Sequence, residues 1–396
     1  MVGIAFSNLI FIATIILFFI FYENKKVFKL FNKSFFVYII LLYIFIIFTS
    51  TVSEYKNFHS LLKSLSIIKF FLFPIAFLYL YKNDKDVLIK ISRISLISII
   101  LISADLYFQY IFGFDIFGYK PIFEDRFNGF FGKELIAGSF ISNFFLISIF
   151  YFFKKINKNR IIYYLYIFFA LGAVLITGER LSLIYQIIST LLIILLFEKK
   201  NIIKYSLIFF LIFIIIFNYS YNLKFKSRIL QMFFYIGISS NITQMDDSFN
   251  AIKKGFEFSP WGSHYISAYK IFIDNKFIGV GLKNFSQACS VEKYLTFNST
   301  SSANGCSNHP HNLYLEILSE LGIIGLLFFI IFLFFIISKS LLFYNKYNNK
   351  YLFLFLLPIL NKTIPFLPSG SFFSSSFGCI FFFNLSIFIL FINQNK

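Results

Sequence analysis

The chain has 396 residues, 58% of them hydrophobic, and carries a formal net charge of +18. A soluble domain of this length could not bury so much apolar surface, so the composition excludes a soluble protein. In a soluble protein the charge would suggest a nucleic-acid partner. Here the lysines lie in short loops between apolar runs, as the positive-inside rule predicts for a membrane protein, and we expect no nucleic-acid partner.

Long apolar runs recur along the chain, and they have the length of a transmembrane helix, about 18 to 22 residues. A transmembrane barrel would instead show short segments of alternating hydrophobicity. The sequence therefore predicts an all-α polytopic membrane protein with about 11 to 12 transmembrane helices. The expected spans are residues 4–22, 35–52, 61–80, 88–111, 134–153, 161–177, 181–197, 203–219, 318–338, 351–366 and 376–393.

Basic residues gather in every second loop, and by the positive-inside rule these loops face the cytoplasm. The loops are residues 25–33, 82–90, 154–160, 199–204 and 339–350. The N-terminus and the remaining loops then face outward. We expect three parts: N-terminal transmembrane helices at 1–219, an outer loop subdomain at 220–317 and C-terminal transmembrane helices at 318–396. Two ionisable residues inside predicted spans, Lys69 and Asp105, are expected to pair with each other.

The outer loop is the largest extramembrane segment. The spacing of its apolar residues from His264 to Phe277 predicts a helix, which Gly279-Val280-Gly281 ends. Cys289 and Cys306 lie in this loop, in a compartment that favours disulfides, and we expect them to pair. A metal site formed by Cys306, His309 and His311 is the alternative. It lacks a fourth ligand at a usual spacing, so we expect no metal.

Residues 307–325 close the outer loop and open a strongly apolar helix. The polar residues that matter here are His309, His311, Asn312, Glu316 and Glu320. The last three follow at spacings of four and share one helix face, and Gly322 and Gly325 would allow close helix packing. A plain helix start, with Asn308 or Asn312 as the cap, explains the asparagine and Pro310. It does not explain paired histidines beside two carboxylates, so we expect a functional site.

Basic residues on the outer side exceed what the topology requires, which predicts an anionic ligand there. Arg180 lies in a tight outer turn and suits a phosphate, since its planar guanidinium donates two hydrogen bonds; an ion pair with Glu179 or a lipid headgroup contact is the alternative. Arg126 could bind a phosphate or a sugar carboxylate, and an ion pair with Asp125 is the alternative. The other outer basic residues are Lys224, Lys226, Arg228, His264 and Lys270.

The order His311-Asn312, nine residues, then Gly322-x-x-Gly325 resembles the signature of the O-antigen ligase and O-antigen polymerase superfamily. Further similar segments are Gly279-Val280-Gly281, the turn at 177–180, Pro368-Ser369-Gly370-Ser371, and the polymerase-type residues between Asp105 and Glu134. The chain also departs from the family. Family ligases carry a second arginine in the long-loop helix, where this sequence offers His264, with Arg228 and Lys270 as other candidates.

The resemblance implies a multi-pass protein of the bacterial inner membrane whose active site, with one long, partly helical loop, faces the periplasm. It implies an enzyme that needs no cofactor and transfers glycan, with inversion, from an undecaprenyl diphosphate-linked oligosaccharide. His311 would be the general base, Glu320 or Glu316 would orient its imidazole, and Arg180 would stabilise the departing diphosphate. The implied substrate-binding residues are Arg126, Arg228, His264, Lys270, His309, Asn312 and Glu316.

Two acceptors stay open. A polymerase passes the glycan to another lipid-linked repeat, and the residues between Asp105 and Glu134 favour this activity. A ligase passes it to the lipid A core. A polysaccharide transporter or flippase is a third alternative, but it would place its key charges midway through the spans. A chain-length regulator protein is a further expected partner of a polymerase.

Overall fold

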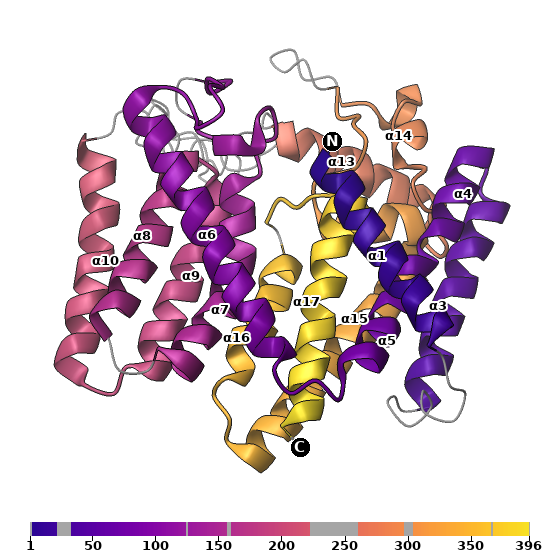
Figure 1. Ribbon diagram of the computed structural model, residues 1–396. Helices are drawn as coiled ribbons and strands as arrows, with labels where there is room; N and C mark the ends of the chain where they lie inside the picture. Colours follow the sequence, from indigo (N-terminus) through magenta and orange to yellow (C-terminus); the bar gives the residue numbers. More distant parts are fainter. Residues whose placement is uncertain are drawn as a thin grey trace. The chain divides into compact units, whose positions relative to one another are not determined.

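The computed structural model describes residues 2–21, 33–123, 126–156, 160–221, 260–296, 304–365 and 367–395. Within these ranges the chain is helical, apart from turns and an isolated bridge between Phe123 and Arg126. The all-α polytopic fold is confirmed. The helices are α1 (Val2–Ile20), α3 (Lys33–Val52), α4 (Phe58–Ser66), α5 (Ile68–Tyr81), α6 (Val87–Phe112), α7 (Ala137–Lys155), α8 (Arg160–Thr177), α9 (Arg180–Phe197), α10 (Asn201–Tyr221), α13 (Pro260–Asp274), α14 (Phe285–Ala288), α15 (Leu313–Tyr347), α16 (Leu352–Leu360) and α17 (Ser375–Gln394) (Figure 1).

A helix overlaps each of the predicted spans. Among the described residues, six helical segments are long and apolar enough to cross a membrane. They are Phe58–Tyr81, Val87–Phe112, Ala137–Lys155, Arg180–Phe197, Leu313–Tyr347 and Ser375–Gln394. The run predicted at 351–366 is shorter than expected, because α16 ends at Leu360 and a 3₁₀ turn, Asn361–Thr363, follows. Pro365 disfavours helical geometry at the residue before it, so the helix must end before that point.

The chain forms two compact units, one of residues 1–83, 232–348 and 362–396, the other of residues 84–231 and 349–361. In the first unit, α5 packs against α1 and α17 (Figure 1). Aromatic rings fill these contacts: Phe11 stacks on Phe73 with ring centroids 3.7 Å apart, and Phe70 stacks on Phe382 at 5.4 Å. In the second unit, α7 packs against α6, α8, α9 and α16.

Helix α15 is broken at Gly322, whose φ of 66° and ψ of −167° belong to a region that is essentially restricted to glycine. The break exposes backbone groups to the 276–281 segment. Glu320 O accepts a hydrogen bond from Gly281 N at 2.8 Å, and Ile323 N donates to Lys276 O at 2.8 Å. We expected Gly322 to serve close helix packing; its role is instead to let a helix and a loop pair through their backbones.

The two backbones approach so closely that neither side tolerates a side chain. A Cβ atom on Gly322 would lie 2.3 Å from Phe277 O. A Cβ atom on Gly279, which also has a positive φ of 65°, would lie 2.4 Å from the carbonyl carbon of Glu320. The glycines of two motifs that are far apart in the sequence therefore meet at one contact.

Replacing Gly322 with alanine should lower the free energy of unfolding by about 3 kcal/mol, because both the backbone geometry and the space exclude a Cβ. Thermal unfolding of the purified protein in detergent measures the effect. Gly370→Ala is the matched control, since its Cβ would meet only ordinary contact distances, 3.5 Å from Phe377 at the nearest. Equal stability of the two variants would contradict the close backbone contact.

Candidate functional site

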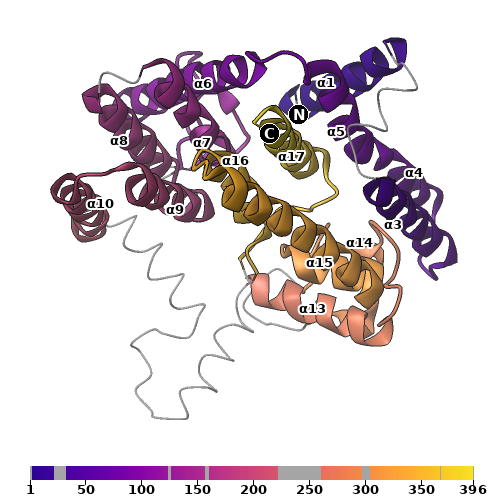
Figure 2. The same cartoon turned by 90° about the horizontal axis from the view of Figure 1, so that it is seen from below.

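Three imidazoles meet in the first unit and are called here the histidine cluster: His264, His309 and His311. His264 lies on α13, which packs alongside α15 (Figure 2), and the other two lie in the loop that leads into α15. The ring centroids of His309 and His311 are 4.1 Å apart, and those of His264 and His311 are 5.2 Å apart. Among the described residues, no group of three or more His, Cys, Asp or Glu side chains is arranged to hold a metal ion.

The backbone of His311 adopts a left-handed conformation, with φ of 56°. This geometry is uncommon for a residue with a side chain and persists only where the surroundings hold it. The carbonyl oxygen of His311 accepts a hydrogen bond from Ser369 N at 2.7 Å and one from the Tyr265 hydroxyl at 3.4 Å. The position of the His311 backbone is therefore set by two other segments of the chain.

The surroundings of His311 favour its neutral form. Burial lowers the pKa of His311, the nearby His309 and His264 lower it further, and the result is a pKa of about 4 even though Glu316 acts in the opposite direction. Burial also lowers the pKa of His309. At neutral pH the His311 imidazole is consequently uncharged and able to accept a proton.

Asn312 caps the helix that follows. Its side-chain oxygen accepts hydrogen bonds from Tyr314 N at 3.0 Å and Leu315 N at 3.1 Å, and its amide nitrogen donates to Leu367 O at 3.3 Å. Asn312, predicted to bind substrate, thus uses its side chain to start α15 and to hold the segment at 367–372.

Glu316 contacts neither histidine ring by a hydrogen bond. Its carboxylate accepts from Lys283 Nζ at 2.9 Å, from Phe372 N at 2.8 Å and from the Ser371 hydroxyl. Glu320 is also buried, and the backbone N–H groups of Lys283 and Phe285 point towards its carboxylate without a well-formed hydrogen bond. Sequence reasoning missed Lys283 and Ser371; both lie in segments that it had singled out for their glycines.

The remaining predicted residues of this unit lie on α13 or outside the described part of the chain. His264 is 7% exposed, and its Nδ1 has no hydrogen-bond partner among the described residues. Lys270 donates from its ammonium group to Leu295 O at 3.1 Å. Arg228 lies outside the described residues, so its predicted role stays a prediction.

A disulfide joins Cys289 and Cys306, three residues before His309. Cys289 is fully buried in a small core of the outer loop with Ala268, Ile271, Val280 and Phe285, against which Cys306 packs. The bridge therefore fastens the chain that enters the histidine cluster to the body of the loop.

In the second unit, Glu179 serves α7. Its carboxylate accepts hydrogen bonds from Gly138 N at 2.8 Å and Ser139 N at 2.9 Å, and from the Ser182 hydroxyl at 2.7 Å. These N–H groups belong to the first turn of α7, which otherwise leaves them unsatisfied. Burial nevertheless raises the pKa of Glu179. Arg180, the first residue of α9, follows Glu179 directly, so the hydrogen bonds of Glu179 also restrict the backbone of Arg180.

Arg126 and Asp105 also belong to this unit. The Asp105 carboxylate accepts from Ile116 N at 2.9 Å and Phe130 N at 2.6 Å, and so holds the outer loop that contains Arg126. Lys69 donates to the Asn8 side chain at 2.7 Å. Each of these two residues therefore has a partner within its own unit, and their expected pairing with each other stays a prediction.

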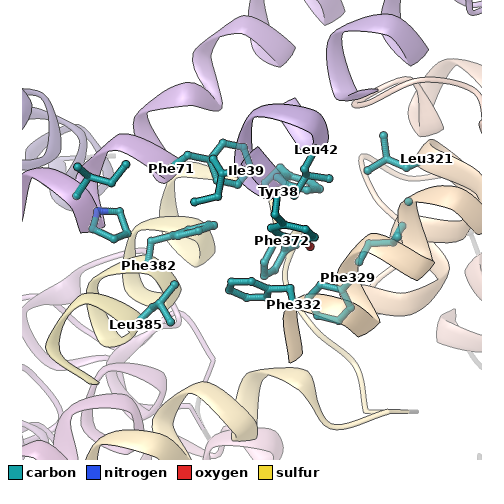
Figure 3. A pocket seen from close by; sticks show the side chains of 15 residues that line it. Tyr38, Ile39, Leu42, Phe71, Leu321, Phe329, Phe332, Phe372, Phe382 and Leu385 are labelled. Carbon is teal, nitrogen blue, oxygen red and sulfur yellow. The ribbon is translucent and has the colours of Figure 1, made fainter. Parts of the chain in front are cut away.

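An apolar pocket lies in the first unit (Figure 3). Side chains converge on it from α3, α5, α15 and α17, and Phe372 contributes from the segment before α17. Ile317 and Leu321 in its wall alternate along α15 with the two buried glutamates. Helix α15 therefore contributes to both the pocket and the histidine cluster region. Its glutamates lie on one face, and the apolar residues of the pocket wall lie on the adjoining face.

Residues 165–330 match the family model described as O-Antigen ligase. Over this range the chain is similar to the O-antigen ligase family. No curated protein matches the chain. The matched range includes the Arg180 turn, α13 and the histidine cluster. Together with the six long apolar helices of the described residues, the match supports a multi-pass membrane protein of the O-antigen ligase or polymerase type.

Removing the disulfide should lower the free energy of unfolding by about 3 kcal/mol, since the bridge constrains a loop of 17 residues in the unfolded chain. Cys289→Ser, Cys306→Ser and the double variant should be destabilised equally, because each loses the same bond. Thermal unfolding without reductant measures this. Additive losses in the double variant would show that the two cysteines act separately.

Proposed function

We propose that this protein is a polymerase-type glycosyltransferase, which passes glycan from an undecaprenyl diphosphate-linked donor to a lipid-linked repeat on the periplasmic face of the inner membrane. The observation that carries the proposal is the placement of His311 beside two other imidazoles at the start of a membrane helix, with a left-handed backbone. Its lowered pKa leaves the ring neutral, which supports a role as the general base. The polymerase-type residues between Asp105 and Glu134 favour a lipid-linked repeat as acceptor.

The reaction is a single displacement. An acceptor hydroxyl attacks the anomeric carbon of the donor sugar, the bond from that carbon to the diphosphate oxygen breaks, and the diphosphate leaves with the electron pair. His311 accepts the hydroxyl proton, and attack opposite the leaving group inverts the anomeric centre. Arg180, helped by Arg126 or Lys270, stabilises the charge on the diphosphate.

The carboxylates take an indirect part in this scheme. Glu316 is fully engaged by Lys283, Ser371 and the backbone of Phe372, and Glu320 lies one helical turn further along α15. Both glutamates therefore act indirectly, by holding the segments around the histidines in place. His264 and His309 remain the proposed contacts to the substrate.

The apolar pocket receives an isoprenoid tail. It is lined by aromatic and aliphatic side chains, and its wall continues along α15 from the residues that frame the histidine cluster. A lipid-linked sugar has this same division, with a charged diphosphate at one end and a hydrocarbon chain at the other.

A ligase that joins the glycan to the lipid A core is the second candidate, because the matching family model is described as O-Antigen ligase. A deletion strain separates the two. Lipid A core bearing a single repeat, with no long chains, indicates a polymerase, whereas bare core with long glycan left on the carrier lipid indicates a ligase.

Substituting His311 with alanine should lower glycan transfer roughly 10²–10⁴-fold, the usual contribution of a general base. The glycan profile of the deletion strain, rescued by each variant, measures this. His59→Ala on α4 is the matched control, because His59 is exposed and lies away from the cluster in the sequence. Full rescue by His311→Ala would remove the basis of the proposed mechanism.

The activity should persist at acidic pH. A general base must be unprotonated, and the pKa of His311 is lowered to about 4. Transfer by membranes assayed across pH should therefore stay nearly constant below the ordinary histidine pKa of about 6.5 and fall only as the pH approaches that of His311. An acidic limb near pH 6.5 would indicate an exposed, unperturbed base.

Filling the pocket should weaken donor binding. Leu42→Trp adds an indole to the pocket wall and should raise the KM for a lipid-linked donor roughly tenfold, with little change in kcat. Leu41→Trp is the control, because Leu41 is 52% exposed on the same helix and outside the pocket. The same KM for both variants would place the lipid tail elsewhere.

A further inference from the structure

Lys283 is a buried cation that the proposed mechanism does not use. Its side chain is 12% exposed, and its ammonium nitrogen lies 2.9 Å from Glu316 Oε1, with the Glu316 side chain 1% exposed. Burial alone would lower the pKa of Lys283, but the carboxylates of Glu316 and Glu320 raise it above its ordinary value. Both members of this ion pair therefore carry charge in a place where charge is costly.

The ion pair ties together three segments that are distant in the sequence. Lys283 follows the 276–281 segment, and Glu316 lies in the first turns of α15. Lys283 Nζ donates to the Ser371 hydroxyl, and that hydroxyl donates to Glu316. Phe372 N donates to the second carboxylate oxygen of Glu316 at 2.8 Å. The segment at 367–372 is thereby fixed to α15.

The same segment holds His311. Ser369 N, two residues before Ser371, donates to the carbonyl oxygen of His311, and Leu367 O accepts from Asn312. His311 is left-handed and needs such restraint. A displacement of the 367–372 segment would therefore release the His311 backbone.

The two charges also act on the histidines with opposite signs. Burial is the main cause that lowers the pKa of His309; Glu316 raises it, and Lys283 and His264 lower it. The backbone of Ser369 raises it as well, and the His311 ring lies beside it. Replacing Glu316 or Lys283 with a neutral residue should therefore shift the pKa of His309 in a predictable direction.

We propose that Lys283, Glu316 and Ser371 form a positioning cluster, which fixes the 367–372 segment to α15 and so holds the His311 imidazole in place for proton transfer. This inference rests on the proposed role of His311 as the general base. The three residues touch neither substrate nor reacting atoms; they act through the backbone of His311 and through the charge that surrounds the histidines.

Histidine titration by NMR tests the charges without any substrate. The chain has four histidines, so ¹³C-histidine-labelled full-length protein in detergent gives few signals, which single histidine variants assign. Glu316→Gln should lower the pKa of His309, because a stabilising negative charge is lost. Lys283→Met should raise it. If the cluster merely holds the loop closed, opening the loop would expose His309 and raise its pKa in both variants, which overturns the electrostatic part of the proposal.

Kinetics test the positioning. The assay uses the full-length protein and lipid-linked glycan extracted from the deletion strain. Lys283→Met and Ser371→Ala should lower kcat by up to about 100-fold, as small misplacements of a catalytic group do, with KM unchanged. Lys283→Arg, which keeps the charge, should retain more activity than Lys283→Met. Lys276→Met is the matched control, because Lys276 is an exposed lysine of the same segment.

A second variant covers the case in which a single substitution prevents folding. The double variant Lys283→Met/Glu316→Gln leaves no unpaired buried charge and should fold. Its His309 pKa should return towards that of the wild type, while kcat stays reduced. Wild-type kcat in the double variant overturns the proposal.

The His311→Ala variant separates failure of this proposal from failure of the proposed function. If His311→Ala keeps full activity, the proposed function itself fails. If His311→Ala is inactive and the Lys283 and Ser371 variants have normal activity, only the positioning cluster fails.

Discussion

The first unit depends on one backbone contact, in which the 276–281 segment pairs with α15 where that helix breaks at Gly322. Helices normally use their own N–H and C=O groups, so a loop can hydrogen-bond to a helix only where the helix is interrupted. Val280 N and Gly281 N donate to Ser319 O and Glu320 O. The pairing fixes where Lys283 emerges, and Lys283 in turn meets Glu316. Two glycine motifs thus determine the position of a buried charge.

The resulting site combines a neutral base, His311, with an ion pair in the segments that hold it. The imidazole of His311 is kept uncharged by burial and by two other histidines, whereas Lys283 and Glu316, a largely buried ion pair, neutralise each other. The ion pair as a whole therefore adds no net charge to the surroundings of the uncharged His311 imidazole. For the proposed transfer of sugar from a diphosphate-linked donor, this arrangement offers a proton acceptor beside an anionic ligand.

Hydropathy and loop charge were sufficient to predict the helices, because each span must satisfy its own backbone hydrogen bonds in lipid. The spacing of His309, His311 and the two glutamates likewise pointed to a site. The partners of those glutamates could not be predicted, since Lys283 and Ser371 reach Glu316 only through tertiary contacts. The break at Gly322 was missed for the same reason: an isolated sequence does not show that the loop at residues 276–281 supplies its hydrogen bonds.

The cap formed by Asn312 has a consequence for the direction of the local electric field. Because α15 begins at Leu313, two residues after His311, the aligned peptide dipoles of its first turns place a partial positive charge at the end of the helix where the His311 loop enters. That field opposes protonation of the resting ring and attracts negative charge at the same place. The helix that anchors the site in the membrane therefore also orients it towards anions, with its backbone rather than with any side chain.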